Sequence, residues 1–179
     1  MPPIAAADEL MGQIRQEILL RNPDLSREGP PPAEEPNAAW QWETPLYFRK
    51  GDPWRRLLVS GWSYPEEEYT WSDGLEAIIE IEPPPIHHEL LLRLLLIPFC
   101  TAGVPSQIIR ISDERHLLGV GSAARECELT FLIPQPRVQG RSFRLFLRFP
   151  NAISPFQAGN SDDHRKLAIA LKSLTGNLL

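Results

Sequence analysis

One segment, residues 61–74, concentrates the side chains that could do chemistry in this chain. It reads GWSYPEEEYTWSDG and holds two Trp, two Tyr, four carboxylates and three hydroxyl groups. Its Pro65 and Gly74 favour turns over a long strand or helix. Flat aromatic rings beside carboxylates and hydroxyls suit a sugar, which has an apolar CH face and a polar hydroxyl edge. The same composition also fits a segment that closes one end of a β-sandwich.

Within the segment, the candidate functions divide between ring stacking and hydrogen bonding. Trp62 and Trp71 would each contribute about 1–3 kcal/mol if they buried a sugar face. The alternative is that either Trp belongs to the core, and Trp62 is the stronger candidate for burial. Tyr64 and Tyr69 are the better candidates for exposed platforms. The carboxylates of Glu66 and Asp73 would accept hydrogen bonds from sugar hydroxyls.

Other roles for the same carboxylates remain open. We favour a structural ion pair from Glu66 to Arg165, which would tie the segment to the C-terminal loop. A glycosidase needs an acid and a second carboxylate at a fixed separation, and nothing in the spacing selects such a pair. Asp162 and Asp163 lie in a polar loop without an EF-hand pattern, so solvation is favoured over calcium binding.

Composition and charge argue against a nucleic-acid-binding protein and a membrane-spanning protein. The 179 residues carry 18 basic and 23 acidic side chains, a formal charge of 18 − 23 = −5, with the two signs mixed along the chain. A protein that binds nucleic acid needs a concentrated basic face, so we expect no nucleic-acid binding. No apolar run approaches the roughly 20 residues of a membrane span. The N-terminus lacks a signal-peptide pattern, which predicts a cytoplasmic protein.

The two cysteines, Cys100 and Cys127, fit no zinc-ligand spacing. A disulfide between them is possible, but two reduced and buried thiols are the favoured interpretation. We therefore expect neither a metal nor another cofactor.

The elements fall into three parts. Residues 1–22 are predicted to be a helical leader, with an expected helix over 8–21 whose apolar stripe would need a docking partner. Residues 23–45 are a proline-rich linker. Residues 46–179 are the predicted β-sandwich domain, and from Arg55 onward the dominant pattern is period two, which predicts strands. Gly119 to Ser122 lacks the pattern of a dinucleotide-binding loop and is interpreted as a turn.

Eight or nine short strands separated by turns predict an all-β protein, an antiparallel and jelly-roll-like β-sandwich. The stretch 89–97 is ambiguous, because leucine also favours helices, but its length and flanking prolines favour a strand. The predicted strands lie near residues 46–48, 77–81, 89–97, 107–111, 117–120, 127–133, 143–149 and 167–171.

The segment 61–74 resembles a G-W-S-x-P-E-x-x-x-x-W-S-D-G signature of β-sandwich modules appended to bacterial glycosyltransferases and other surface-polysaccharide biosynthesis proteins. Residues 149–155 and 162–167 resemble the second signature of these modules, a Ser-Pro turn followed by an Asp/Arg pair. The resemblance covers roughly residues 55 to 175. The chain departs from it at Glu68-Tyr69, where the pattern often has Trp-Gly. Residues 9–15 also resemble a short helix at the start of enzymes from the same pathways.

The resemblance implies a noncatalytic carbohydrate-binding module that acts in the biosynthesis of O-antigen, capsule or exopolysaccharide. The alternative is a protein-interaction module that docks a glycosyltransferase through helix 8–21 without binding sugar. A glycan-active enzyme is the least favoured hypothesis. The predicted carbohydrate site comprises Tyr64, Glu66, Tyr69, Trp71 and Asp73, with Trp62, Asp162, Asp163 and Arg165 in support.

Overall fold

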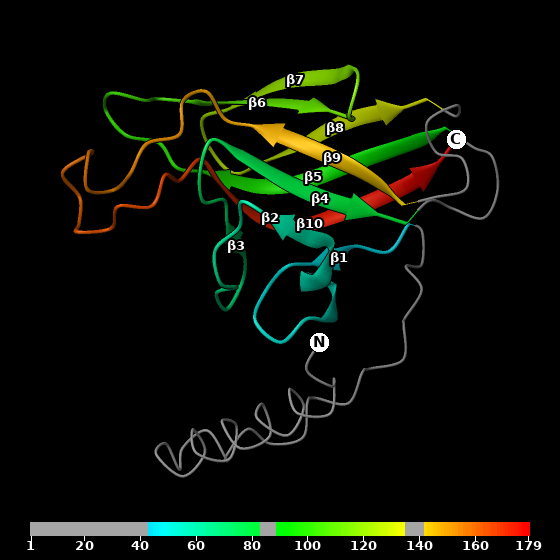
Figure 1. Ribbon diagram of the computed structural model, residues 1–179, viewed down its shortest axis with the longest axis horizontal. Helices are drawn as coiled ribbons and strands as arrows, with labels where there is room; N and C mark the ends of the chain where they lie inside the picture. Colours follow the sequence, from blue (N-terminus) through cyan, green and yellow to red (C-terminus); the bar gives the residue numbers. More distant parts are fainter. Residues whose placement is uncertain (1–42, 83–88, 135–141) are drawn as a thin grey trace, which may run out of the picture. The chain divides into compact units, whose positions relative to one another are not determined.

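The structure is a computed structural model, and it describes residues 43–82, 89–134 and 142–179. Within these ranges the regular structure is strands and one short 3₁₀ helix, η2 (Pro53–Leu57), so the predicted all-β class is confirmed. The strands form two antiparallel sheets, which are seen one over the other in Figure 1. Helix 8–21 and residues 23–42 of the predicted linker lie outside the described residues.

The first sheet, sheet A, is built around the two longest strands. Its strand order is β1-β10-β5-β8, and β3 also pairs with β10. All of these pairs are antiparallel. The strands are β1 (Leu46–Tyr47), β3 (Thr70–Trp71), β5 (Leu90–Pro98), β8 (Cys127–Ile133) and β10 (Ile169–Leu178).

The second sheet, sheet B, has the order β2-β4-β9-β6-β7, again with antiparallel pairs throughout. Successive strands from β3 onward alternate between the sheets, except that β6 and β7 form a hairpin within sheet B. The strands are β2 (Leu58–Ser60), β4 (Glu76–Ile81), β6 (Gln107–Ser112), β7 (Leu117–Ala123) and β9 (Phe143–Arg148).

The inner faces of both sheets share one hydrophobic core. The predicted alternation is confirmed in β4, where Ala77, Ile79 and Ile81 are buried and the intervening side chains are half-buried. It is also confirmed in β5, whose even-numbered leucines are buried. The ambiguous leucine-rich stretch is a strand because β10 and β8 pair with it on both sides. Its outward-facing residues, Leu91, Arg93, Leu95 and Ile97, are half-buried.

Two expectations from the sequence were wrong in detail. Gly119 to Ser122 is not a turn but part of β7. A Cβ on Gly119 would lie 2.6 Å from Cδ1 of Phe131, and one on Gly121 would lie 2.8 Å from Cδ1 of Leu129. These glycines therefore permit edge strand β7 to approach the side chains of β8 in the other sheet.

The last strand is longer than the predicted 167–171 and continues to Leu178. A register shift between Leu171 and Ser173 leaves Lys172 as an extra residue opposite β5. Such a bulge changes which residues face the core. Leu171 and Leu174 are consequently both buried, and the period-two pattern fails at this point.

Gly61 at the end of β2 offers a test of how tightly the next segment is held. Its φ is +73°, and an added Cβ would lie 2.1 Å from the carbonyl oxygen of Glu76. We expect Gly61→Ala to lower the free energy of unfolding by about 2–4 kcal/mol, because backbone strain and overlap act together. Urea-induced unfolding followed by tryptophan fluorescence would measure the change.

Gly51→Ala is the matched control, since Gly51 also has positive φ (+87°), but a Cβ added there would have no neighbouring atom within 4 Å. In this variant only backbone strain acts, so we expect the free energy of unfolding to fall by about 1 kcal/mol. Equal losses in the two variants would show that the close approach at Gly61 does not matter.

Candidate functional site

The segment 61–74 is an irregular hairpin rather than a loop throughout. Trp62 and Ser72 form an isolated antiparallel bridge. The amide of Ser63 donates to the carbonyl of Trp71 at 2.8 Å, and the amide of Glu66 donates to the carbonyl of Tyr69 at 2.8 Å. Only the tip of the segment is therefore a turn, and its two arms hold the aromatic residues in fixed positions.

Ser72 attaches the hairpin to the start of β10. It is fully buried, and its Oγ accepts hydrogen bonds from the amides of Ala168 and Ile169, each at 3.1 Å. Its own amide donates to the carbonyl of Ile169 at 2.8 Å. Gly74 adds a further bond from its amide to the carbonyl of Lys166 at 2.8 Å. The WSDG end of the segment is thus a docking element for the C-terminal strand.

The two tryptophans have different environments. Trp62 is only 8 % exposed and belongs to the core, as expected, while its Nε1 donates to the carbonyl of Ile78 at 3.1 Å. Trp71 is half-buried and packs edge-on against Tyr69 and Phe99, with ring centroids 5.6 and 6.1 Å away. Tyr69, expected from the sequence to be exposed, is half-buried as well, so Tyr64 is the exposed aromatic ring of the segment.

A first hollow, which we call the Tyr64 hollow, has a volume of about 450 Å³. Tyr64 is 93 % exposed, and Asp73 is exposed as well. Among the described residues, neither the Tyr64 hydroxyl nor the Asp73 carboxylate has a side-chain hydrogen-bond partner. The hollow is lined by Arg55, Trp62, Ser63, Tyr64, Asp73 and Arg165.

Arg165 connects this hollow to the C-terminal loop, but not in the way the sequence suggested. Its guanidinium pairs with Asp163, with Nη2 to Oδ2 at 2.6 Å, rather than with Glu66. Its Nη1 donates to the Oγ of Ser63 at 2.9 Å, and this bond joins the loop to the hairpin. Asp163 prevails because it lies two residues away and also accepts the amide of Arg165 at 2.9 Å.

The ion pair changes the titration of both partners. Hydrogen bonds from Arg165 hold the pKa of Asp163 below its ordinary value of 3.8. The same contact raises the pKa of Arg165 above its ordinary value. Both groups are therefore charged at neutral pH, and the guanidinium keeps a fixed orientation.

A second hollow, the Tyr69 hollow, lies at the tip of the hairpin and has a volume of about 580 Å³. It is lined by Lys50 and by residues 65–69, and Lys50 Nζ lies 3.1 Å from Glu67 Oε1. Burial raises the pKa of Tyr69, and the neighbouring Glu66 carboxylate raises it further.

The predicted site residues are thus divided between two hollows that share no lining residue. Trp62, Tyr64, Asp73 and Arg165 line the first, whereas Glu66 and Tyr69 line the second. Three predicted site residues line neither hollow: Trp71, Asp162 and Asp163.

Sequence reasoning missed two contributors to the Tyr64 hollow. Arg55 lies in η2, where its Nη1 donates to the carbonyl of Leu58 at 2.7 Å, and nothing in its local sequence marks it. Ser63 is buried beneath Arg165. Ser63 is part of the G-W-S signature that the segment resembles, and this resemblance could have marked Ser63 as a site residue.

Comparison with known proteins gives no match to a family model or to a curated protein sequence. In the described ranges, no group of three or more His, Cys, Asp and Glu side chains is arranged to hold a metal ion. Cys100 and Cys127 are free thiols whose pKa burial raises. No helix among the described residues is long and apolar enough to cross a membrane.

Removing the Ser72 hydroxyl should loosen the hairpin. Ser72→Ala leaves the buried amides of Ala168 and Ile169 without their acceptor, so we expect a loss of about 1–3 kcal/mol in the free energy of unfolding. Hydrogen exchange of these amides should quicken at the same time. Ser60→Ala, at an exposed serine, is the control; unchanged exchange in Ser72→Ala would refute the docking role.

Acid should release the Asp163–Arg165 contact. Because the pKa of Asp163 is lower in the folded than in the unfolded chain, the pair stabilises the fold fully above about pH 4 and loses this effect as pH falls through the depressed pKa. We expect Asp163→Asn to be less stable than wild type at pH 6, with the difference shrinking toward pH 2.

Urea unfolding at a series of pH values would measure this difference. Asp162→Asn removes the same charge from the same loop without touching the Arg165 contact. If Asp162→Asn lost as much stability as Asp163→Asn, the cause would be the change in net charge and not the Arg165 contact.

Proposed function

We propose that this chain is a noncatalytic carbohydrate-binding module that acts in bacterial surface-polysaccharide biosynthesis. The observation that supports it most is the Tyr64 hollow, where an exposed phenol ring lies beside two guanidinium groups and a carboxylate that has no hydrogen-bond partner among the described side chains. The resemblance of residues 61–74 and 149–167 to the modules of glycosyltransferases gives the biological setting.

Each group in the hollow has a counterpart in a sugar. The Tyr64 ring stacks on the apolar CH face, and the Asp73 carboxylate accepts hydrogen bonds from one or two hydroxyls. The donors are supplied by Arg55 and Arg165. Arg165 is already oriented by Asp163 and Ser63, so little side-chain entropy is lost there on binding.

Several features favour binding over catalysis. The hollow is lined by a single carboxylate, Asp73, whereas most glycosidases use two that flank the scissile bond. Trp62 also lines the hollow, and its buried indole supplies no acid or base. We also propose that the fold is a jelly roll, which has two four-stranded sheets formed by two Greek keys. The strand orders β3-β10-β5-β8 and β4-β9-β6-β7 support this topology.

Binding of the full chain to a bacterial glycan array is the direct test. Tyr64→Ala should weaken binding about tenfold or more, since stacking on a sugar face is worth about 1–3 kcal/mol. Asp73→Asn keeps the shape but loses the charge, and we expect a smaller loss. Because both side chains are exposed, both variants should unfold at the wild-type temperature.

Tyr47→Ala is the matched control, since Tyr47 is an exposed tyrosine on β1 outside both hollows. Tyr69→Ala distinguishes the hollows: if it alone abolishes binding, the sugar occupies the Tyr69 hollow. Wild-type binding by both Tyr64→Ala and Asp73→Asn would remove the proposed site. If no glycan binds and deletion of residues 1–30 abolishes co-purification with a glycosyltransferase, the docking alternative replaces the proposal.

A further inference from the structure

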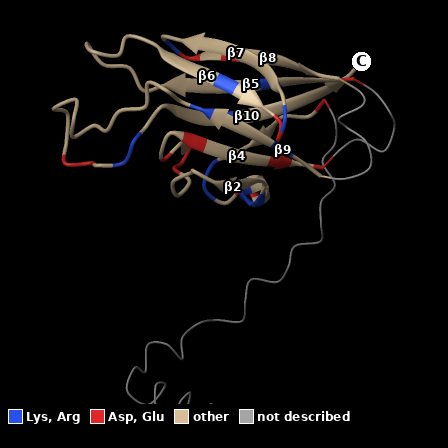
Figure 2. Ribbon diagram, turned by 45° about the horizontal axis from the view of Figure 1, so that its top comes forward, with Lys and Arg blue, Asp and Glu red and all other residues tan. Residues whose placement is uncertain are grey.

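The outer face of sheet B carries an unusual row of charges. The strand register places Glu76 of β4 opposite Arg148 of β9, and Arg148 opposite Arg110 of β6. On its other side Arg110 faces Val120 of β7. Figure 2 shows acidic positions on β4 beside basic positions on the neighbouring strands. The row therefore runs acidic, basic, basic and apolar, with two guanidinium groups as direct neighbours.

Like charges directly opposite each other destabilise a sheet, so this juxtaposition has a cost. Arg148 is compensated by Glu76, with Nε to Oε2 at 2.6 Å. Among the described residues, Arg110 is the one cation on a strand that lacks a carboxylate within 4.0 Å. The compensated pairs on the other strands are Arg93–Glu128, Arg144–Glu80 and Lys172–Glu126.

Arg110 and Arg148 also line a hollow of about 490 Å³, the Arg110 hollow, beside the turn between β6 and β7. Arg115 from the turn contributes a third guanidinium, and Ser112 contributes a hydroxyl. Val120 and Leu117, which are 58 % and 62 % exposed, supply apolar surface. The hollow thus combines several donors with a surface for carbon atoms.

Asp113, one of the two carboxylates that line this hollow, has other partners. Asp113 accepts the amides of Arg115 and His116 at 2.8 and 2.6 Å, and lies 3.4 Å from Nδ1 of His116. Glu114 also lines the hollow but comes from the exposed turn.

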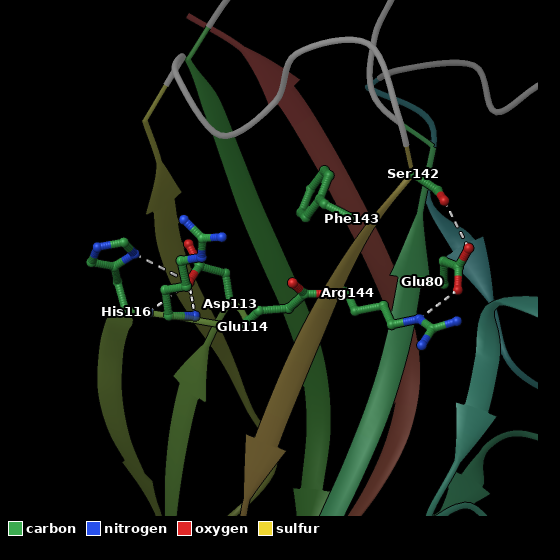
Figure 3. A pocket seen from close by; sticks show the side chains of 8 residues that line it. Glu80, Asp113, Glu114, His116, Ser142, Phe143 and Arg144 are labelled. Carbon is green, nitrogen blue, oxygen red and sulfur yellow. Dashed lines mark hydrogen bonds and ion pairs between the residues drawn. The ribbon is translucent and has the colours of Figure 1, made fainter.

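An adjacent hollow shares residues 113–116 and is drawn in Figure 3. There Glu80 accepts bonds from Ser142 at 2.7 Å and from Arg144 at 2.9 Å, and these lower its pKa. Among the cations on the described strands, Arg110 therefore remains the one without a carboxylate within 4.0 Å.

We propose that the Arg110 hollow binds an oxyanion, the carboxylate or phosphate group of a small organic ligand. Guanidinium groups recognise both anions through paired N–H donors. Such a ligand would neutralise the Arg110–Arg148 repulsion while its carbon skeleton contacts Val120 and Leu117. This site lies apart from the Tyr64 hollow, and it does not depend on the carbohydrate site proposed above.

Titration of the ¹⁵N-labelled full chain at low salt would test this. The probes are glucuronate for a carboxylate, glucose 1-phosphate for a phosphate, and glucose as the neutral control. We expect at least one anion to shift amides of β6, β7 and β9 saturably, and glucose to leave them unmoved. Added sodium chloride should weaken the binding. The anion that binds identifies the group that is recognised.

Arg110→Gln should weaken anion binding about tenfold or more, because one guanidinium is removed. Its thermal midpoint without ligand should equal or exceed that of wild type, since a repulsion disappears with the charge. The matched control is Arg93→Gln on the outer face of sheet A, which should bind as wild type does.

In the titration, the proposal fails if neither anion gives saturable shifts or if glucose gives equal shifts. Among the variants, it fails if Arg110→Gln binds as wild type does or if Arg93→Gln weakens binding equally. A lowered midpoint for unliganded Arg110→Gln would also contradict it, because that would show a structural role for Arg110.

Discussion

Burial of one face of almost every strand in a single core is the constraint on which the rest of this structure depends. The strands of each sheet turn alternate side chains inward, and the inner side chains of both sheets meet. Hydrophobic burial is the dominant favourable term in folding, so register in both sheets follows from it. No charged side chain among the described residues is buried, so the charges lie on the outer faces and at the ends, where binding sites can form.

The ends of such a sandwich need their own support, because their backbone groups have no complete ladder. Here the hairpin 61–74 is held by Ser72, whose hydroxyl replaces part of the sheet pairing at the start of β10. Arg165 then joins the next loop to the hairpin through Ser63. The polar residues of the segment therefore serve two purposes, since some fasten it and others, such as Tyr64 and Asp73, remain available to a ligand.

The sequence could predict the buried positions of the strands better than the contacts between distant segments. Alternation identified most core positions of β4, β5, β8 and β9, because inward-facing residues follow from period two alone. It failed at Lys172, where one extra residue reverses the pattern, and at Gly119 and Gly121, whose role depends on Phe131 and Leu129 in the other sheet. The partner of Arg165 was also wrong, because Asp163 supplies both a local backbone acceptor and an ion pair.

Site residues are harder to predict for a related reason. The composition of segment 61–74 marked it as a candidate site, yet Tyr64 and Tyr69 line different hollows and Trp71 lines neither. Arg55 joins the Tyr64 hollow from a different element. Arg110 gave no signal in its own strand. Its character arises from Arg148 and Val120, which are distant in the chain and become its neighbours only through the register. A binding site made by cross-strand neighbours is therefore visible only once the strand order is known.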